Sequence, residues 1–389
     1  MDDIRQQLAE KYDRIIADTL RQLSGPLTKK KLTAALYAAN KAYWVARLAM
    51  LDTDTVYDAE RVAAALSVPY MSAMETFSKR VRSIYANYQS AFDLSQKDAH
   101  RLLNGVSYDR TIAQTLRSIA DGMPEGPEKT EILATISAPA YKYRLDRAEQ
   151  MCKQAARVCE DIRNGEIPTV REFLQTEVEK AYNISADEIL KMPSQTIIDD
   201  LTGAERGISD SLSLIDTRTV NEIVNAEWSG ENFSEAIWDN TAQLAENVKK
   251  VLIEGELTGA PEGKMAEKVA KTFETGMYEA RRVVRTESNY CTTQAEKKAL
   301  ADAGFDEYEF LTVHEENVCD TCDDLDGKRF KLADAVIGVN MPPLHPFCRC
   351  RISSPEETEA EIQAEIDRML EETPLEEIER RLDKMIEKL

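Results

Sequence analysis

The feature that most constrains the fold is a group of cysteine and histidine residues near the C-terminus. Four of the chain's seven cysteines and one of its three histidines belong to this group. Zinc takes four thiolate or imidazole ligands in a tetrahedron, often as one Cys-x-x-Cys pair and a second pair from a distant loop. The group therefore predicts a Zn²⁺ ion held by four of five candidate ligands, which are Cys319, Cys322, His345, Cys348 and Cys350.

Cys319 and Cys322 form the expected first pair, and spacing alone does not choose two ligands among the remaining three. So many strong ligands leave no open coordination position, which favours a structural metal over a catalytic one. Unmetallated thiols or a disulfide are the alternatives. The N-terminus is polar and acidic, and no stretch approaches the roughly 18 apolar residues of a membrane helix. We therefore expect a cytoplasmic chain with reduced thiols, which favours metal over disulfide.

The segment around the cysteines is too small to bury a large core, so we expect the metal to contribute folding free energy directly. Asp326 and Gly327 follow the first cysteine pair, and the glycine predicts a turn that redirects the chain. The neighbouring aspartates are expected to accept hydrogen bonds around the metal. A Cys322→Ser change is then expected to unfold residues 276–351 and to spare the N-terminal helices.

Helical periodicity dominates the rest of the chain, in which Gly and Pro are sparse. Proline, glycine and capping residues predict helix boundaries at Pro69, Gly165, Thr169 and Ser185. The clearest strand pattern is residues 305–313, where apolar side chains nearly alternate. We expect helices over residues 2–23, 28–51, 233–255, 263–275 and 278–303.

These patterns predict a mainly α fold with three parts. The parts are an elongated helical N-terminal region, a small α+β module stapled by zinc, and an acidic helical C-terminal tail. The N-terminal region has possible internal boundaries near residues 122–127 and 165. The expected division is a helical region at 1–227, connecting helices at 228–275, the zinc module at 276–355 and the tail at 356–389.

The tail carries 13 acidic and 5 basic residues, and two apolar stripes run along its predicted helices. A tail of this kind either packs on its own protein or docks to a partner, and the sequence leaves both open. The residues that we predict to bind a partner are Ile362, Ile366, Leu375, Ile378 and Leu382.

The formal net charge of −21 makes nucleic acid and anionic membranes poor default partners. A zinc module that binds nucleic acid needs basic residues around its cysteines, and the chain offers few there. Those present are Lys328, Arg329, Lys331, Arg349 and Arg351.

Several motifs in a fixed order resemble a known family. They are an amphipathic helix with Trp238, the helical triplet Arg285-Thr286-Glu287, a strand, Cys-x-x-Cys, Leu-Asp326-Gly327, and His345-Pro-x-Cys348-Arg-Cys350. Over about residues 230–351 the chain resembles the phage head morphogenesis family, the Mu F-like minor head proteins of tailed phages.

The resemblance implies a structural minor head protein rather than an enzyme. Family members lie inside the capsid near the portal, enter during procapsid assembly in the host cytoplasm, and influence genome packaging or ejection. The implied partners are portal, capsid or scaffold subunits, with weak contact to packaged DNA and no membrane. Residue chemistry further predicts that Arg285 and Glu287 fasten their helix to the zinc module through charge-assisted hydrogen bonds.

Two enzyme classes compete with this interpretation. An ADP-ribosyltransferase-like enzyme is suggested by Glu307-Tyr308-Glu309, but charges on the solvent face of a strand explain this triplet better, and residues 356–389 are too short for a catalytic domain. A thiol oxidoreductase also uses Cys-x-x-Cys. The surrounding aspartates are expected to raise the thiol pKa, which disfavours a reactive thiolate.

Overall fold

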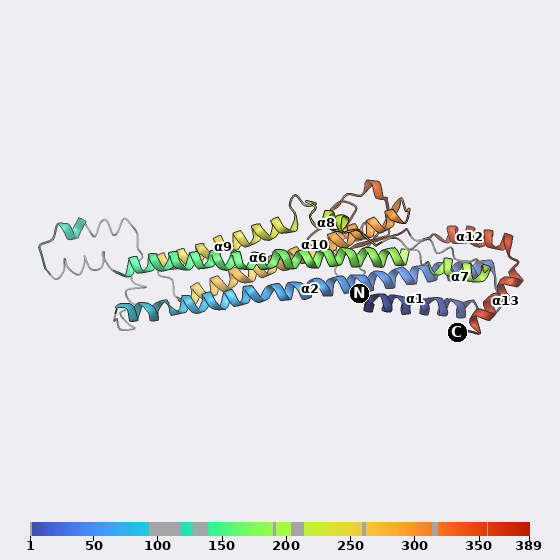
Figure 1. Ribbon diagram of the computed structural model, residues 1–389, viewed down its shortest axis with the longest axis horizontal. Coiled ribbons are helices and arrows are strands. Elements are labelled where there is room, and N and C mark those ends of the chain that lie inside the picture. Colours follow the sequence, from blue (N-terminus) through green and yellow to red (C-terminus); the bar gives the residue numbers. More distant parts are fainter. Residues whose placement is uncertain are drawn as a thin grey trace. The chain divides into compact units, whose positions relative to one another are not determined.

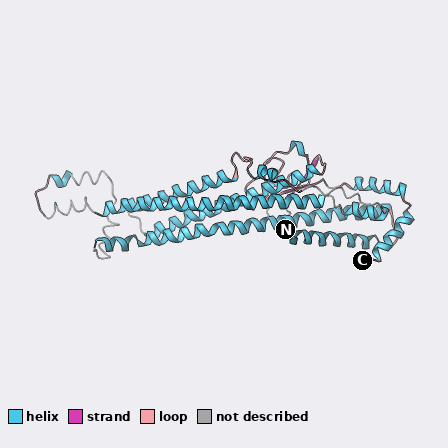
Figure 2. Cartoon of the chain, in the orientation of Figure 1, coloured by secondary structure: helices cyan, strands magenta, loops and turns pink. Residues whose placement is uncertain are grey.

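The computed structural model describes residues 2–92, 118–126, 129, 139–189, 192–203, 214–258, 262–312, 318–355 and 357–389. Helices account for most of these residues, and the strands lie close to the C-terminal end of the chain (Figures 1 and 2). The predicted mainly α fold with a small α+β segment and a helical tail is confirmed.

The helices of the first 302 residues are mostly long. They are α1 (Asp2–Leu23), α2 (Lys29–Phe92), α6 (Pro139–Ile189), α7 (Pro193–Thr202), α8 (Thr217–Val224), α9 (Phe233–Thr258) and α10 (Glu262–Asp302). The later elements are shorter. They are β1 (Glu307–Leu311), α11 (Asp320–Asp323), β2 (Arg329–Lys331), η1 (Leu332–Asp334), β3 (Arg351–Ser353), α12 (Glu359–Glu372) and α13 (Leu375–Ile386).

The chain forms two compact units, each assembled from separate stretches of sequence. The first unit comprises residues 1–62, 170–233 and 284–389, and the second comprises residues 63–169 and 234–283. The sequence-based division at 227, 275 and 355 stays a prediction.

The second unit has an apolar core made by helical residues. Phe77 of α2 and Phe273 of α10 stack with ring centroids 6.0 Å apart, and Tyr70, Met151 and Val248 are buried beside them. The predicted helix boundary at Pro69 was wrong, because α2 continues through it. A proline removes one main-chain hydrogen bond, and the burial of the neighbouring aromatic side chains offsets that loss.

Two further predicted boundaries in this unit were also wrong. Residues 263–275 and 278–303 form the single helix α10, in which Gly276 lies so close to α2 that an added Cβ would stand 2.8 Å from the Tyr70 ring. This glycine serves close helix packing rather than a helix end. Helix α6 likewise runs through Gly165 and Pro168, and the Thr169 hydroxyl donates to the Gly165 carbonyl (2.8 Å) instead of capping a new helix.

The predicted cap at Ser185, in the first unit, is also absent. Ser185 lies inside α6, is buried, and its hydroxyl accepts a hydrogen bond from Arg47 Nη2 (3.1 Å). The sequence pattern predicted that the Ser185 hydroxyl caps a helix, but this hydroxyl makes a tertiary hydrogen bond with Arg47.

The C-terminal tail packs on its own protein in the first unit. Helices α12 and α13 lie against α7 and α1, as the red end of the chain in Figure 1 shows. Thr358 and Glu361 form the capping box that starts α12, a boundary that the sequence reasoning did not specify. The stripe residues Ile362, Ile366, Ile378 and Leu382 are buried with Leu20, Leu23, Leu32, Leu36, Ile197 and Leu201, whereas Leu375 is exposed.

Polar contacts join the tail to the same neighbours. Glu379 accepts from the Leu27 backbone N–H (2.9 Å), and Arg381 donates to the Leu201 carbonyl (3.0 Å). The sequence allowed a tail packed on its own protein or a tail docked to a partner, and in this structure its apolar stripes face its own core.

A three-stranded antiparallel sheet with strand order β2-β1-β3 precedes the tail. Tyr308 of β1 pairs with Phe330 of β2, and Phe310 pairs with Ile352 of β3. The predicted strand at 305–313 is observed as Glu307–Leu311, and Val313 lies outside the described residues. Strands β2 and β3 were missed because three residues are too few for an alternation pattern.

Candidate metal centre

The first pair of predicted ligands lies on a single helical turn. Cys319 is the N-cap residue of α11, and the backbone N–H groups of Cys322 and Asp323 both donate to its carbonyl (3.0 Å each). Because the two cysteines are three residues apart on this turn, their sulfur atoms point to the same side. The turn thus forms a knuckle that offers two thiols to one ion.

The Leu-Asp-Gly motif ties this knuckle to the sheet. Gly327 has a left-handed φ of 69° and donates its N–H to the Phe310 carbonyl (2.8 Å). The Asp326 carboxylate accepts from the Thr312 N–H (2.7 Å), so it holds the end of β1. The predicted turn at Gly327 is therefore present, and Asp326 supports the strand to which the knuckle is attached.

The second group of ligands comes from a loop held by α10. The Cys348 N–H donates to the His345 carbonyl (3.1 Å), which closes a tight turn. Within this turn, the Phe347 N–H donates to the Thr286 hydroxyl oxygen (3.2 Å). The Asn289 side chain then donates to the Cys350 carbonyl (2.9 Å). Helix α10 therefore fixes the loop at two points that flank Cys348.

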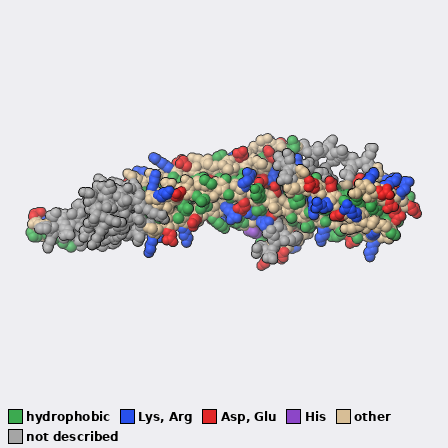
Figure 3. Space-filling model, turned by 90° about the horizontal axis from the view of Figure 1, so that it is seen from below, with side chains coloured by type: hydrophobic (Ala, Val, Ile, Leu, Met, Phe, Trp, Pro, Cys, Tyr) green, Lys and Arg blue, Asp and Glu red, His purple; other side chains and the backbone are tan. Residues whose placement is uncertain are grey.

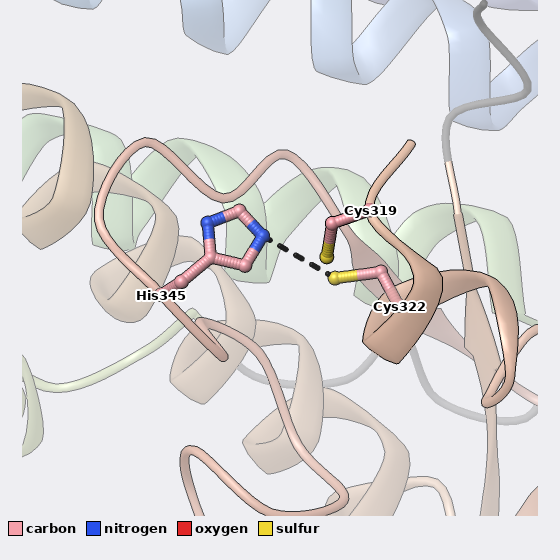
Figure 4. Close-up of side chains that lie close together, drawn as sticks. All are labelled: Cys319, Cys322 and His345. Atoms are coloured by element: carbon pink, nitrogen blue, oxygen red, sulfur yellow. Dashed lines mark hydrogen bonds between the residues drawn. The ribbon is translucent and has the colours of Figure 1, made fainter. Parts of the chain in front are cut away.

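All five predicted ligands converge, and Cys322 is their common member. The ligand atoms of Cys319, Cys322 and His345 lie within 4.8 Å of one another, and so do those of Cys322, Cys348 and Cys350. Figure 4 shows the first of these groups, with its side chains pointing toward one another. Zn–S bonds of about 2.3 Å in a tetrahedron place ligand atoms roughly 3.8 Å apart. The arrangement fits one zinc ion, and a set of thiols with one imidazole suits zinc better than Mg²⁺ or Ca²⁺.

The imidazole of His345 has the orientation of a metal ligand. Its Nδ1 lies 2.8 Å from the Pro346 carbonyl, and its Nε2 faces the thiols, 3.4 Å from the Cys322 sulfur. When Nδ1–H donates to the carbonyl, Nε2 carries the lone pair toward the ion. Burial opposes the charged form of His345, but the Pro346 carbonyl and the Cys348 and Cys319 thiols raise its pKa overall.

The thiols influence one another strongly. The pKa of Cys348 is well below its ordinary value because Cys322 and Cys350 donate S–H hydrogen bonds to its sulfur. The same hydrogen bonds, together with burial, raise the pKa of Cys322 and of Cys350. Three neighbouring thiols resist full ionisation because the thiolates repel one another. A bound dication offsets this repulsion because it stabilises every thiolate that coordinates it.

Burial divides the five candidates. Cys322, Cys348 and Cys350 are buried against Phe310, with Val318, Leu325, Phe330 and Leu344 packed around them. Cys319 and His345 are exposed. This apolar cluster is small, so a metal ion bound at its centre would contribute a large part of the folding free energy of this segment.

Arg349 and Arg351, beside the second group of ligands, bind acidic residues of distant helices. Arg349 donates through Nε and Nη2 to Asp52 of α2, with a shortest contact of 2.5 Å. Arg351 is buried and donates to Glu296 of α10 (2.6 and 3.1 Å) and to the Thr55 hydroxyl (3.1 Å). Asp52 and Thr55 lie about 300 positions from the loop in sequence, which is why sequence reasoning missed them as parts of the site.

Arg285 and Glu287 of the helical triplet have partners elsewhere in the first unit. Arg285 pairs with Glu60 of α2 (2.5 Å), and the Glu287 carboxylate accepts from the Trp228 indole N–H (3.1 Å). Thr286 and Asn289 of the same helix contact the ligand loop at residues 345–350. Thr286 and Asn289 lie three residues apart and so share one face of α10, a spacing that could have revealed them.

The geometry disfavours a thiol oxidoreductase. In thiol oxidoreductases a helix N-terminus lowers the pKa of the first cysteine, whereas α11 is a single turn of four residues. The pKa of Cys319 is lowered by the Cys322 N–H and then by the neighbouring thiol and imidazole, so our expectation of a raised pKa was wrong for this thiol. The pKa of Cys322 is raised, by its hydrogen bond to Cys348 and by burial. Exposed aspartates are screened by water, and the nearer donors outweigh them.

A transferase and a nucleic-acid-binding module gain no support from side-chain placement. Glu309, of the triplet that suggested a transferase, pairs across the sheet with Arg329 (3.3 Å) and is buried rather than on a solvent face. Arg349 and Arg351 face acidic residues of their own chain. On the face in Figure 3, the Lys and Arg side chains of the described residues lie among Asp and Glu and form no separate basic area. No described helix has the length and apolar character needed to cross a membrane.

Comparison with known proteins identifies the class. Residues 246–353 match the family model described as phage Mu protein F like protein. The match includes α10, the whole sheet and all five candidate ligands, whereas Trp238 lies outside it. It supports the resemblance to the phage head morphogenesis family that the motifs predicted. The family indicates a structural role in phage head morphogenesis. No curated protein and no solved structure matches the chain.

Proposed function

We propose that the protein is a structural minor head protein of a tailed phage that associates with portal or capsid subunits inside the head during procapsid assembly. The observation that carries this proposal is the match over residues 246–353, which coincides with the segment that bears the ligand cluster and the Arg285-Thr286-Glu287 motif. We propose that this role is non-enzymatic, which the structural character of the matched family supports. Effects on packaging or ejection, and weak contact with packaged DNA, belong to the same proposal.

We further propose that the cluster binds one structural Zn²⁺. Zinc bound there cross-links the α11 knuckle to the loop at 345–350, and its binding free energy becomes folding free energy of the first unit. Residues of the chain then hold the ordered loop against two helices. Arg349 holds the loop on Asp52 of α2, and Thr286 and Asn289 hold it on α10.

The partner-binding role of the tail is a separate proposal. Ile362, Ile366, Ile378 and Leu382 are buried in the core of the first unit, so a partner can reach them only when the tail leaves that core. Deletion of residues 356–389 tests the idea, and unchanged incorporation of the shortened chain into particles contradicts it.

The head-protein proposal is tested in the phage or prophage that encodes the chain. Mass spectrometry of purified procapsids and mature particles should detect the chain in both, and disruption of its gene should give particles that lack it. A chain that stays with unassembled soluble protein and never enters particles contradicts the proposal. The zinc measurement is independent of this experiment, so the two proposals can fail separately.

A further inference from the structure

The geometry points to Cys319, Cys322, His345 and Cys348 as the four zinc ligands, with Cys350 as the spare thiol and Thr286 as the residue that positions the second ligand turn. This inference rests on the proposed zinc site and names its ligands.

The same backbone hydrogen bond closes the two turns that carry the ligand pairs. In each pair the second ligand residue follows the first by three positions and donates its N–H to the carbonyl of the first. The distance is 3.0 Å for Cys322 to Cys319 and 3.1 Å for Cys348 to His345. The first turn is helical and the second is not, but in both the ligand atoms of the pair come close to the Cys322 sulfur, so each turn offers a pair of ligands to the same ion. Cys350 lies beyond the second turn and has no counterpart in the first.

The second turn has the signature of type II. Pro346 occupies its second position, where proline's fixed φ is favoured, and Phe347 occupies its third position with φ 61°. A left-handed φ is unfavourable for an aromatic residue, so the surrounding structure must hold it. The Thr286 hydroxyl does so by accepting the Phe347 N–H at 3.2 Å. Thr286 therefore orients His345 and Cys348 without touching the metal.

Cys350 has the surroundings of a core residue. It directly precedes β3 and stands two positions before Ile352, so an extended chain places both side chains on one face. Both are buried, and Ile352 pairs with Phe310, which packs against the thiols. The Cys350 carbonyl is engaged by Asn289. Its sulfur lies within 4.8 Å of those of Cys322 and Cys348, a distance that core packing also produces.

Charge favours the set that contains His345. Three thiolates and a neutral imidazole around Zn²⁺ leave a net charge of about −1, whereas four thiolates leave about −2. Cys322, Cys348 and Cys350 are buried in an apolar cluster, where an extra uncompensated negative charge is costly. His345 Nε2 lies 3.4 Å from the Cys322 sulfur, and His345 also hydrogen-bonds the Cys319 thiol, as expected for an imidazole that shares an ion with both.

The test uses the full chain loaded with Co²⁺, whose thiolate charge-transfer band grows with the number of bound thiolates. Cys350→Ser should keep one metal per chain and the full band of the unmodified chain. Cys348→Ser should lose about one third of the band and bind metal more weakly, since one of three thiolates is removed. The reverse pattern, or an equal loss in both variants, overturns the assignment. X-ray absorption of the zinc-loaded unmodified chain checks the same point without substitution, with three sulfurs and one nitrogen expected and four sulfurs contradicting.

Thr286→Val, which keeps the shape and removes the acceptor, should weaken metal binding about 10- to 100-fold at an unchanged ligand count. Thr286→Ser should restore the affinity, and an affinity of Thr286→Val equal to that of the unmodified chain contradicts the positioning role. An unmodified chain that binds no metal defeats the proposed zinc site itself. An unmodified chain that binds metal through Cys350 defeats only the ligand assignment.

Discussion

Different kinds of interaction stabilise the interiors of the two units of this chain. The second unit has an apolar core in which stacked Phe77 and Phe273 are surrounded by aliphatic side chains. The centre of the first unit combines buried thiols with buried ion pairs, among them Arg351 with Glu296 and Lys180 with Glu177. Apolar burial stabilises without partners, whereas a buried charge or thiolate stabilises only while its partner or metal is present. The part of the first unit around the ligand cluster is therefore conditional on its partners, whereas the apolar core under the tail and the core of the second unit are not.

Removal of metal should give the largest difference between the units. With a strong chelator, amide hydrogen exchange should accelerate over residues 29–62 and 284–355 and stay slow over the core residues of the second unit. The sequence alone led us to expect only residues 276–351 to respond, but Arg349 and Arg285 tie this segment to Asp52 and Glu60 of α2. Acceleration confined to residues 276–351 contradicts the extended coupling.

Loss of one buried ion pair should come next. Arg351→Leu removes the hydrogen-bonded partner of the buried Glu296 carboxylate and leaves it only the longer-range charge of Arg47, at a cost of about 3–5 kcal/mol of unfolding free energy in the first unit. Chemical denaturation measures this cost. Arg380→Leu, which breaks an exposed pair with Glu377, is the matched control and should leave the transition unchanged. Equal effects of the two variants contradict the importance of the buried pair.

A cavity in the second unit should cost a similar amount without affecting the metal. Phe273→Ala removes a fully buried ring, which costs about 3–5 kcal/mol. The expected loss of stability is in the second unit, and metal content per chain should stay at the level of the unmodified protein. If the variant loses metal as well as stability, the result contradicts the expectation that the second unit is stabilised independently of the metal site.

The smallest effect concerns pH and a carboxyl group that is buried in the second unit. Burial raises the pKa of Glu166 to about 7, against a hydrogen bond from Tyr70 that lowers it. The folded state then holds its proton more tightly than the unfolded state, so this group's contribution is present below about pH 4.5 and is lost as the pH rises to about 7. Glu166→Gln should remove this slope, worth about 3 kcal/mol at most. An unchanged pH profile of the second unit in that variant contradicts the prediction.

The sequence predicted the ligand cluster and several helices because both are local patterns. Cysteine and histidine spacing located all five converging ligands, and apolar periodicity located α1 at residues 2–23. Local rules failed where tertiary packing decided the outcome. Pro69 and Gly276 suggest helix ends, yet their helices continue because Tyr70 and its neighbours are buried there.

The partners of the zinc loop could not be predicted because sequence distance hides them. Asp52 lies 297 residues before Arg349, and no periodicity connects the two. The tail shows the same limit, since its apolar stripes were evident but their burial against α1 and α7 was not. Sequence patterns identified which side chains would be buried or would bind a ligand. The residues that they contact could be found only from the fold.

The central claim is that the first unit is organised around one bound zinc ion. Native mass spectrometry of the full chain, purified without added chelator, tests it most directly. The account predicts a mass that includes one Zn²⁺ per chain, lost on acidification together with the exchange protection of the first unit. A chain that lacks metal and still protects residues 29–62 and 284–355 from exchange contradicts it.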